Sequence, residues 1–121
     1  MSATESEEIR VWNISKALAV LIAEQNSYSY VDKLGYATSR DLVLFYLKEA
    51  LRDLHSLKNK KSFENKKAEE EFNSIRFDFL DKEIEDISKI ENKQKLREIT
   101  SLIASKALAL SMNLSAGEVK Q

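Results

Sequence analysis

The sequence predicts an all-α protein, a four-helix bundle-like single domain over residues 1–121. The chain contains no proline, and no glycine occurs between Tyr36 and Ala116, so no residue there forces a helix to end. Apolar residues recur at helical spacing among lysines and glutamates in the same region, as the buried faces of amphipathic helices require. With 121 residues and 43% hydrophobic content, the chain is long enough to bury one core.

The first helix is predicted to begin near Ser6, after a flexible end at residues 1–5. The helix is predicted to end at residues 25–27, where small polar side chains compete for backbone hydrogen bonds. A short extra helix or turn is predicted next, from Tyr28 to Leu34, and we expect Gly35 to end it. The buried stripe of the first helix is predicted to comprise Val11, Ile14, Leu18, and Leu21 or Ile22, widened by Trp12 and Ala17.

The second helix is predicted to begin at Thr38 or Ser39 and opens with six apolar residues, 42–47. A helix that is apolar around nearly its whole circumference must be surrounded, either at the centre of the bundle or by another subunit. We therefore expect the chain to act in a homo- or hetero-oligomer, with a contiguous apolar patch on its surface. The candidate interface residues are Leu44, Phe45, Tyr46 and Phe77.

The third and fourth helices are predicted to follow a charged loop at residues 58–67. The third runs from Ser62 or Ala68 to Ile90, and the fourth runs from Lys93 to about Met112. Asn92 is the only candidate break between them, so one bent helix is an alternative. Residues 114–121 are expected to form a flexible end. The inward residues of the third helix are predicted to be Phe72, Ile75, Phe79, Leu80, Ile84, Ile87 and Ile90.

Composition argues against most catalytic and metal chemistry. The chain has no cysteine and a single histidine, His55, which excludes thiolate metal sites and any site that needs two histidines. We therefore predict no enzyme activity, no metal site and no cofactor. The acidic first residues do not form a signal peptide, and no apolar run approaches the length of a membrane span. We expect an intracellular, cytoplasmic protein without a membrane anchor.

Two segments could contact nucleic acid. One is a basic block of five lysines, Lys58, Lys60, Lys61, Lys66 and Lys67. Three acidic residues follow it directly, Glu69, Glu70 and Glu71. Direct nucleic-acid binding is therefore predicted to be weak or absent. Residues 29–47 also look like a helix-turn-helix, although the second helix would present Val43, Leu44 and Phe45 where polar base contacts are needed.

One ordered pattern spans roughly residues 14–116. Leu18, Leu21, Ile22 and Glu24 are followed by Asn26-Ser27, Leu34, Phe45-Tyr46, Leu51 and Leu54. Beyond the charged loop come Ile84, Ile87, Ile90 and then Lys95-Leu96-x-x-Ile99. This pattern resembles the helical domain of the GINS family of replication factors. The sequence departs from that family's pattern in three ways: no small β domain follows the helices, no proline precedes the Phe-Tyr helix, and the third-helix arginine pattern is replaced by Lys89-Ile90-Glu91-Asn92-Lys93.

The resemblance implies a non-catalytic subunit that packs beside paralogous subunits and bridges a replicative helicase to its partners, associated with the nucleoid. Together with the absence of catalytic motifs, it predicts a helical scaffold subunit of a multiprotein assembly. Two alternatives remain open. One is a small α-helical subunit of an RNA-guided, CRISPR-type defence complex that uses the lysine block, and the other is a helix-turn-helix regulator.

Overall fold

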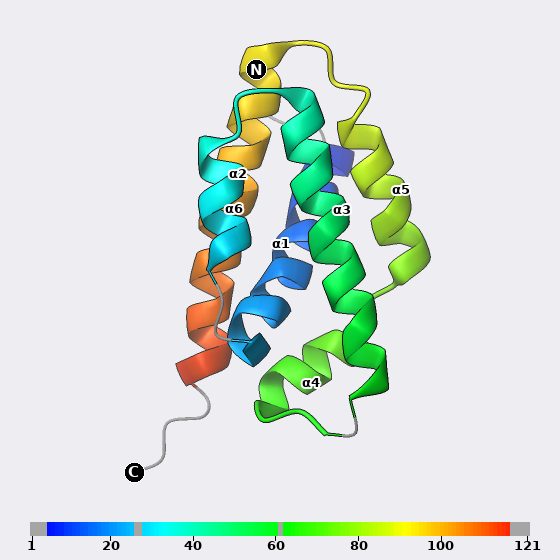
Figure 1. Ribbon diagram of the computed structural model, residues 1–121, viewed down its shortest axis with the longest axis vertical. Helices are drawn as coiled ribbons and strands as arrows, with labels where there is room; N and C mark the ends of the chain where they lie inside the picture. Colours follow the sequence, from blue (N-terminus) through cyan, green and yellow to red (C-terminus); the bar gives the residue numbers. More distant parts are fainter. Residues whose placement is uncertain (1–4, 26–27, 61, 117–121) are drawn as a thin grey trace.

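The computed structural model describes residues 5–25, 28–60 and 62–116 of the chain. These residues contain no strand, so the predicted all-α class is confirmed. Figure 1 shows α1, α3 and α6 running in the same direction, α5 running the opposite way, and α4 crossing one end of the bundle. The elements are α1 (Glu5–Gln25), α2 (Ser29–Tyr36), α3 (Arg40–Ser56), the 3-10 helix η1 (Leu57–Asn59), α4 (Lys66–Asn73), α5 (Phe77–Ile87) and α6 (Lys93–Ala116).

Helix α1 is the surrounded helix of the bundle. Every residue from Ala17 to Ile22 is buried, and Figure 1 shows α1 passing between α6 on one side and α3 and α5 on the other. Residues 42–47 do not lie at the centre of the bundle, because Leu42 and Phe45 are 39% and 55% exposed, and burial of this run by another subunit stays a prediction. Helix α3 lies on the outside and buries only one stripe, Val43, Leu47, Ala50 and Leu54.

Helices α1 and α6 pack in parallel with a fixed register. Lys95 pairs with Glu7 at 3.2 Å near their first turns, and the Ser15 hydroxyl donates to the Ile103 carbonyl oxygen at 3.3 Å further along. Small side chains on the buried side of α6 allow the close approach, because they keep the two backbones near each other. These small buried residues are Thr100, Ala104, Ala107 and Ser111.

Helix α6 begins at Lys93, as predicted, and is separate from α5. The Asn92 side chain accepts from the Lys95 backbone N–H at 3.0 Å and so caps the new helix. The helix continues to Ala116, past the predicted end at Met112. Leu114, within the predicted flexible end at residues 114–121, packs against the core, and residues 117–121 of that end lie outside the described residues. At the other end, α1 already begins at Glu5.

Helix α2 confirms the predicted extra helix, but Gly35 does not end it. The helix continues through Gly35 to Tyr36, and the chain leaves it at Ala37, where the backbone is extended. Helix α3 then begins at Arg40, and the side chain of Ser39 accepts from the Leu42 backbone N–H at 3.2 Å. This capping residue was one of the two predicted starts of the second helix.

The single helix predicted from residue 62 or 68 to Ile90 is two helices, α4 and α5. The Ser74 and Ile75 backbone N–H groups both bond three residues back, each at 3.1 Å, to the carbonyls of Glu71 and Phe72. The Ser74 hydroxyl also donates to the Glu71 carbonyl oxygen at 2.7 Å, which closes the last turn of α4. The break lets Ala68 and Phe72 in α4 and Leu80, Ile84 and Ile87 in α5 all reach the core, although the two helices point in different directions.

Candidate protein-interaction surface

The predicted interface residues lie in two separate places. Phe45 is exposed and its ring lies 5.8 Å from that of Tyr46, while Leu44 and Tyr46 are half-buried against the core. Phe77 lies beside His55, with ring centroids 4.4 Å apart. His55 is ten residues beyond Phe45 in α3, which is about 15 Å along the helix. The prediction that Phe77 points outward in one patch with Tyr46 is therefore wrong, because Phe77 packs against the core.

The predicted lysine contacts are dispersed among internal partners. Lys60 forms an ion pair of 2.6 Å with Glu24, and this hydrogen bond raises the pKa of Lys60. The Lys58 ammonium lies 4.0 Å from the centroid of the Phe77 ring, and Lys66 lies 4.0 Å from Glu69. Lys67 is exposed at the start of α4, and Lys61 lies outside the described residues. The structure therefore does not gather the described lysines into one basic site.

A different surface combines exposed apolar side chains with hollows. We call it the α1 face and define it by Ile9, Trp12, Ile75, Phe79, Ile99 and Leu102. A hollow of about 310 Å³ lies between α1 and α5, and a second hollow of about 550 Å³ lies between α1 and α6. Ile9 lines both hollows. The outer side of α1 therefore forms their common floor, and helices α5 and α6 form the two walls.

Four side chains of the α1 face are large, apolar and exposed. Ile9 is 50% exposed, Trp12 and Phe79 are each 46% exposed, and Leu102 is 42% exposed. They come from three different helices, α1, α5 and α6. Apolar residues gathered over a hollow, with a polar rim, are typical of protein-binding surfaces, whereas single exposed apolar residues are ordinary.

Helix α4 explains why only half of α1 is uncovered. It lies across the C-terminal half of α1, where Ala19 and Val20 are buried, and its Ala68 is fully buried. Glu71 of α4 pairs with Lys16 of α1 at 3.2 Å, which marks the edge of this cover. On the N-terminal side of Lys16, the outward residues Ile9 and Trp12 stay exposed.

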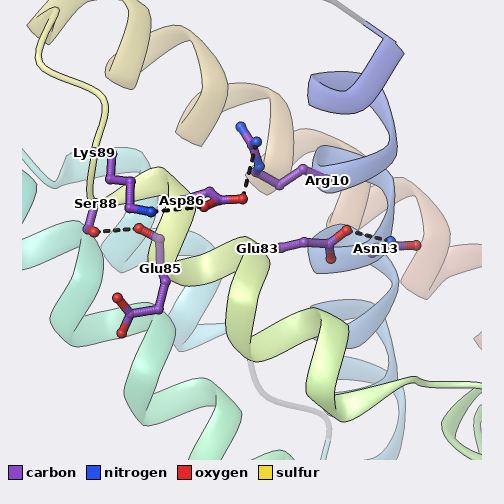
Figure 2. A network of polar contacts seen from close by, with 7 residues as sticks. All are labelled: Arg10, Asn13, Glu83, Glu85, Asp86, Ser88 and Lys89. Atoms are coloured by element: carbon purple, nitrogen blue, oxygen red, sulfur yellow. Dashed lines mark hydrogen bonds and ion pairs between the residues drawn. The ribbon is translucent and has the colours of Figure 1, made fainter.

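A polar network fixes the wall formed by α5. Figure 2 shows Arg10 and Asn13 of α1 pointing toward Asp86 and Glu83 of α5. The Asn13 side-chain amide donates to Glu83 Oε2 at 2.8 Å, and Arg10 pairs with Asp86 at 3.6 Å. Lys89 also pairs with Asp86 at 3.6 Å. The network holds α5 antiparallel to α1 directly beside the hollow, because Asn13 and Glu83 also line it.

Burial sets the electrostatics of this network. Desolvation is the main cause that raises the pKa of Glu83, with a smaller contribution from the Asp86 charge, while the Asn13 hydrogen bond and the Arg10 charge act in the opposite direction. Arg10 Nε and Glu83 Oε1 are buried and form no hydrogen bond within the described part of the chain. The network therefore holds the helices in position at some electrostatic cost.

Two further features that bear on function are a metal site and a membrane-spanning helix. Within residues 5–25, 28–60 and 62–116, no three histidine or carboxylate side chains lie close enough together to hold one metal ion. Among the same residues, no helix combines the length and the apolar character that crossing a bilayer demands. The α1 face itself presents apolar surface, the indole ring of Trp12 and a rim with both acidic and basic side chains.

Sequence reasoning missed the α1 face. Trp12 was assigned to the buried stripe of the first helix and Phe79 to the inward face of the third, but both are nearly half exposed. In the sequence, Ile9, Trp12 and Lys16 follow one another at helical spacing, which separates them from the stripe through Ile14 and Leu18. That second stripe was the available signal, and only the position of α4 decides which half of it is covered.

The comparisons with known proteins give one close relative. The chain is 57% identical over 117 residues to a protein of Archaeoglobus fulgidus described as uncharacterized, and the match covers 97% of each chain. No protein-family model matches the chain. No solved structure matches it either.

Proposed function

This chain belongs to the same family as the Archaeoglobus fulgidus protein, and we propose that it is a non-catalytic helical subunit that binds another protein through the α1 face. The observation that supports this most directly is the gathering of Ile9, Trp12, Phe79 and Leu102 over two adjoining hollows. Tryptophan and other aromatic anchors in pockets contribute most of the binding energy at protein interfaces. The proposal places the protein inside the cell.

The finer proposal is a scaffold role in DNA replication, as the resemblance to the GINS family implies. It stays a prediction that rests on the spacing of Leu18, Leu21, Phe45-Tyr46 and the following helices. Under this proposal, the partners are paralogous subunits and components of the replicative helicase. Recovery of those proteins with the chain from native cells would support it.

The alternatives that depend on nucleic acid draw less support from the geometry. A defence-complex subunit using the lysine block would need those lysines free, but Lys60 is held by Glu24 and Lys58 lies over Phe77. A helix-turn-helix regulator would read bases with α3. Among its exposed opening residues, Arg40 could donate to a base edge, but the Asp41 carboxylate repels phosphates, and Leu42 and Phe45 cannot donate hydrogen bonds to base edges.

The test is co-purification of the tagged full-length chain from native cells, with the recovered proteins identified and quantified. We expect a defined partner with the wild type and at least a tenfold loss of it with Trp12→Ala/Phe79→Ala, since truncating an anchor commonly costs about 2 kcal/mol. The matched control is Tyr36→Ala/Phe45→Ala, which also removes two exposed aromatics but lies on α2 and α3.

The two variants distinguish the α1 face from the surface around Phe45. The four side chains are between 46% and 85% exposed, so each variant should keep the helical circular dichroism of the wild type. If the control variant loses the partner and the α1-face variant retains it, the interface lies around Phe45, and the proposed site is wrong.

A further inference from the structure

We infer that the partner of the α1 face is a second copy of this chain, related to the first by a two-fold axis parallel to α1. This inference rests on the proposed function and names the partner. In such a dimer each contact occurs twice, because the same surface of both copies meets itself. The α1 face must therefore be complementary to itself in shape and in charge.

Each half of the α1 face offers a hollow and a large apolar side chain beside it. The hollow of about 310 Å³ has Phe79 on its α5 wall, and the hollow of about 550 Å³ has Leu102 on its α6 wall. Both side chains are nearly half exposed. A two-fold axis parallel to α1 places the first hollow of one copy over the second hollow of the other, so that Phe79 and Leu102 of each copy enter the hollows of its partner.

The heights of these two side chains along α1 agree with this axis. The hydrogen bond that fixes the register of α1 and α6 joins residues 88 positions apart, so Leu102 is level with residue 14. Helix α5 runs the opposite way with Glu83 beside Asn13, so Phe79, four positions before Glu83, is level with residue 17. An axis parallel to α1 leaves these heights unchanged. Phe79 of one copy and Leu102 of the other then lie within about 5 Å of the same height.

The charges that line the two hollows balance. The first hollow has two cations and one anion, and the second has one cation and two anions, so the whole lining is neutral. Ion pairs within the chain engage one cation of the first hollow and one anion of the second, and setting these aside leaves one charge of each sign beside each hollow. A copy of the same face is balanced in the same way. The lining charges are Lys16, Arg76 and Glu83 in the first hollow and Lys106, Glu7 and Glu8 in the second.

The charges of the walls select the direction of the axis. Helix α5 is mostly acidic and α6 is mostly basic. A two-fold axis perpendicular to α1 would place α5 of one copy against α5 of the other, and like charges brought together are unfavourable. The axis parallel to α1 places α5 against α6 instead, which brings opposite charges together on both sides of the interface.

Single cysteines test the dimer directly, because the chain contains no cysteine. Ile9 lines both hollows and therefore lies next to the proposed axis. Facing helices lie about 8–10 Å apart, which is too far for a disulfide, so the reagent is a short bismaleimide. In the purified chain alone, Ile9→Cys should form cross-linked dimers about tenfold faster than Phe45→Cys, because a dimer holds the two thiols together. Phe45 is the matched control, since it is an apolar residue of similar exposure on α3. Equal rates would overturn the inference.

A mixture of two variants tests the direction of the axis. Lys82→Cys and Ser105→Cys replace exposed residues on α5 and α6, each three positions from Phe79 or Leu102. The parallel axis predicts cross-links when the two variants are mixed and none in either variant alone, because each copy places its α5 against α6 of the other. Cross-linking of Lys82→Cys with itself would indicate the perpendicular axis and overturn the inference. Absence of cross-links in the mixture would also overturn it.

Failure of the inference differs from failure of the proposed function. If Ile9→Cys and Phe45→Cys react alike but Trp12→Ala/Phe79→Ala still releases a different protein recovered from native cells, the α1 face binds that protein and the second copy is wrong. If the double variant retains its native partner in full, the α1 face is not the binding site, and both proposals are wrong.

Discussion

Tyr30 is the residue whose ionisation the fold changes most clearly. Its hydroxyl donates to the Asp53 carboxylate and so ties α2 to α3. Burial and this carboxylate raise the pKa of Tyr30 to about 12. Because the folded pKa is raised, the stabilisation is fully present below pH 10, the ordinary pKa of tyrosine, and is lost as the pH rises toward 12.

We therefore expect one of the four tyrosines to ionise near pH 12 in the folded protein, as followed by tyrosinate absorbance. Tyr30→Phe should remove this late step, and Tyr36→Phe, at a position 85% exposed, should not. The late step should also move to lower pH in Asp53→Asn, because the negative charge is gone. A late step that persists in Tyr30→Phe would contradict the assignment.

At the scale of the elements, local signals predicted where helices begin better than where they end. Ser39 and Asn92 each supply a capping side chain next to a new apolar stripe, so the starts of α3 and α6 could be predicted. The break at Ser74 could not be predicted, because serine occurs both within helices and at their ends. Tertiary packing decides whether the helix continues or ends there. The same holds for Gly35, which a short helix tolerates in its interior.

The candidate site was harder to predict than the helices. An apolar run such as 42–47 indicates that a helix buries apolar surface. It does not show which helix lies at the centre of the bundle. Helix α1 takes that place because its alanines at positions 17, 19 and 23 let neighbours approach from several sides. Exposure of Ile9 and Trp12 then depends on where α4 ends, which is a property of the assembled bundle.

The parallel packing of α1 and α6 predicts a position-specific cost of enlarging a side chain. Ala107 is fully buried on the inner side of α6, whereas Ala109, two residues later, is exposed. Ala107→Leu should lower the free energy of unfolding by about 2 kcal/mol, because extra methylene groups overpack a dense core. Ala109→Leu should change it by less than about 0.5 kcal/mol. Denaturant unfolding measures both, and similar costs would contradict the packing of α6.

At the scale of the whole molecule, the α1 face lies between walls of opposite charge. Helix α5 carries five acidic residues and one basic residue, and α6 carries four basic residues and one acidic residue. A partner that spans both walls therefore meets a charge gradient across an apolar floor. Such a gradient favours one orientation of the bound partner over its reverse, since like charges brought together are unfavourable.

The prediction at this scale is that the chain acts as part of an oligomer, which sedimentation velocity can test. Over a wide concentration range, alone and with the co-purified partner, we expect a species larger than a monomer in which Trp12 is buried. Trp12→Ala/Phe79→Ala should shift the population toward the monomer, because it removes two anchors whose burial drives association. Tyr36→Ala/Phe45→Ala should leave the larger species in place.

A wild-type chain that stays monomeric at every concentration, with and without the material recovered from native cells, would remove the basis for a scaffold subunit. A monomer alone that becomes a complex only with its partner would instead indicate a hetero-oligomer, and the α1 face is its interface if Trp12→Ala/Phe79→Ala prevents the complex.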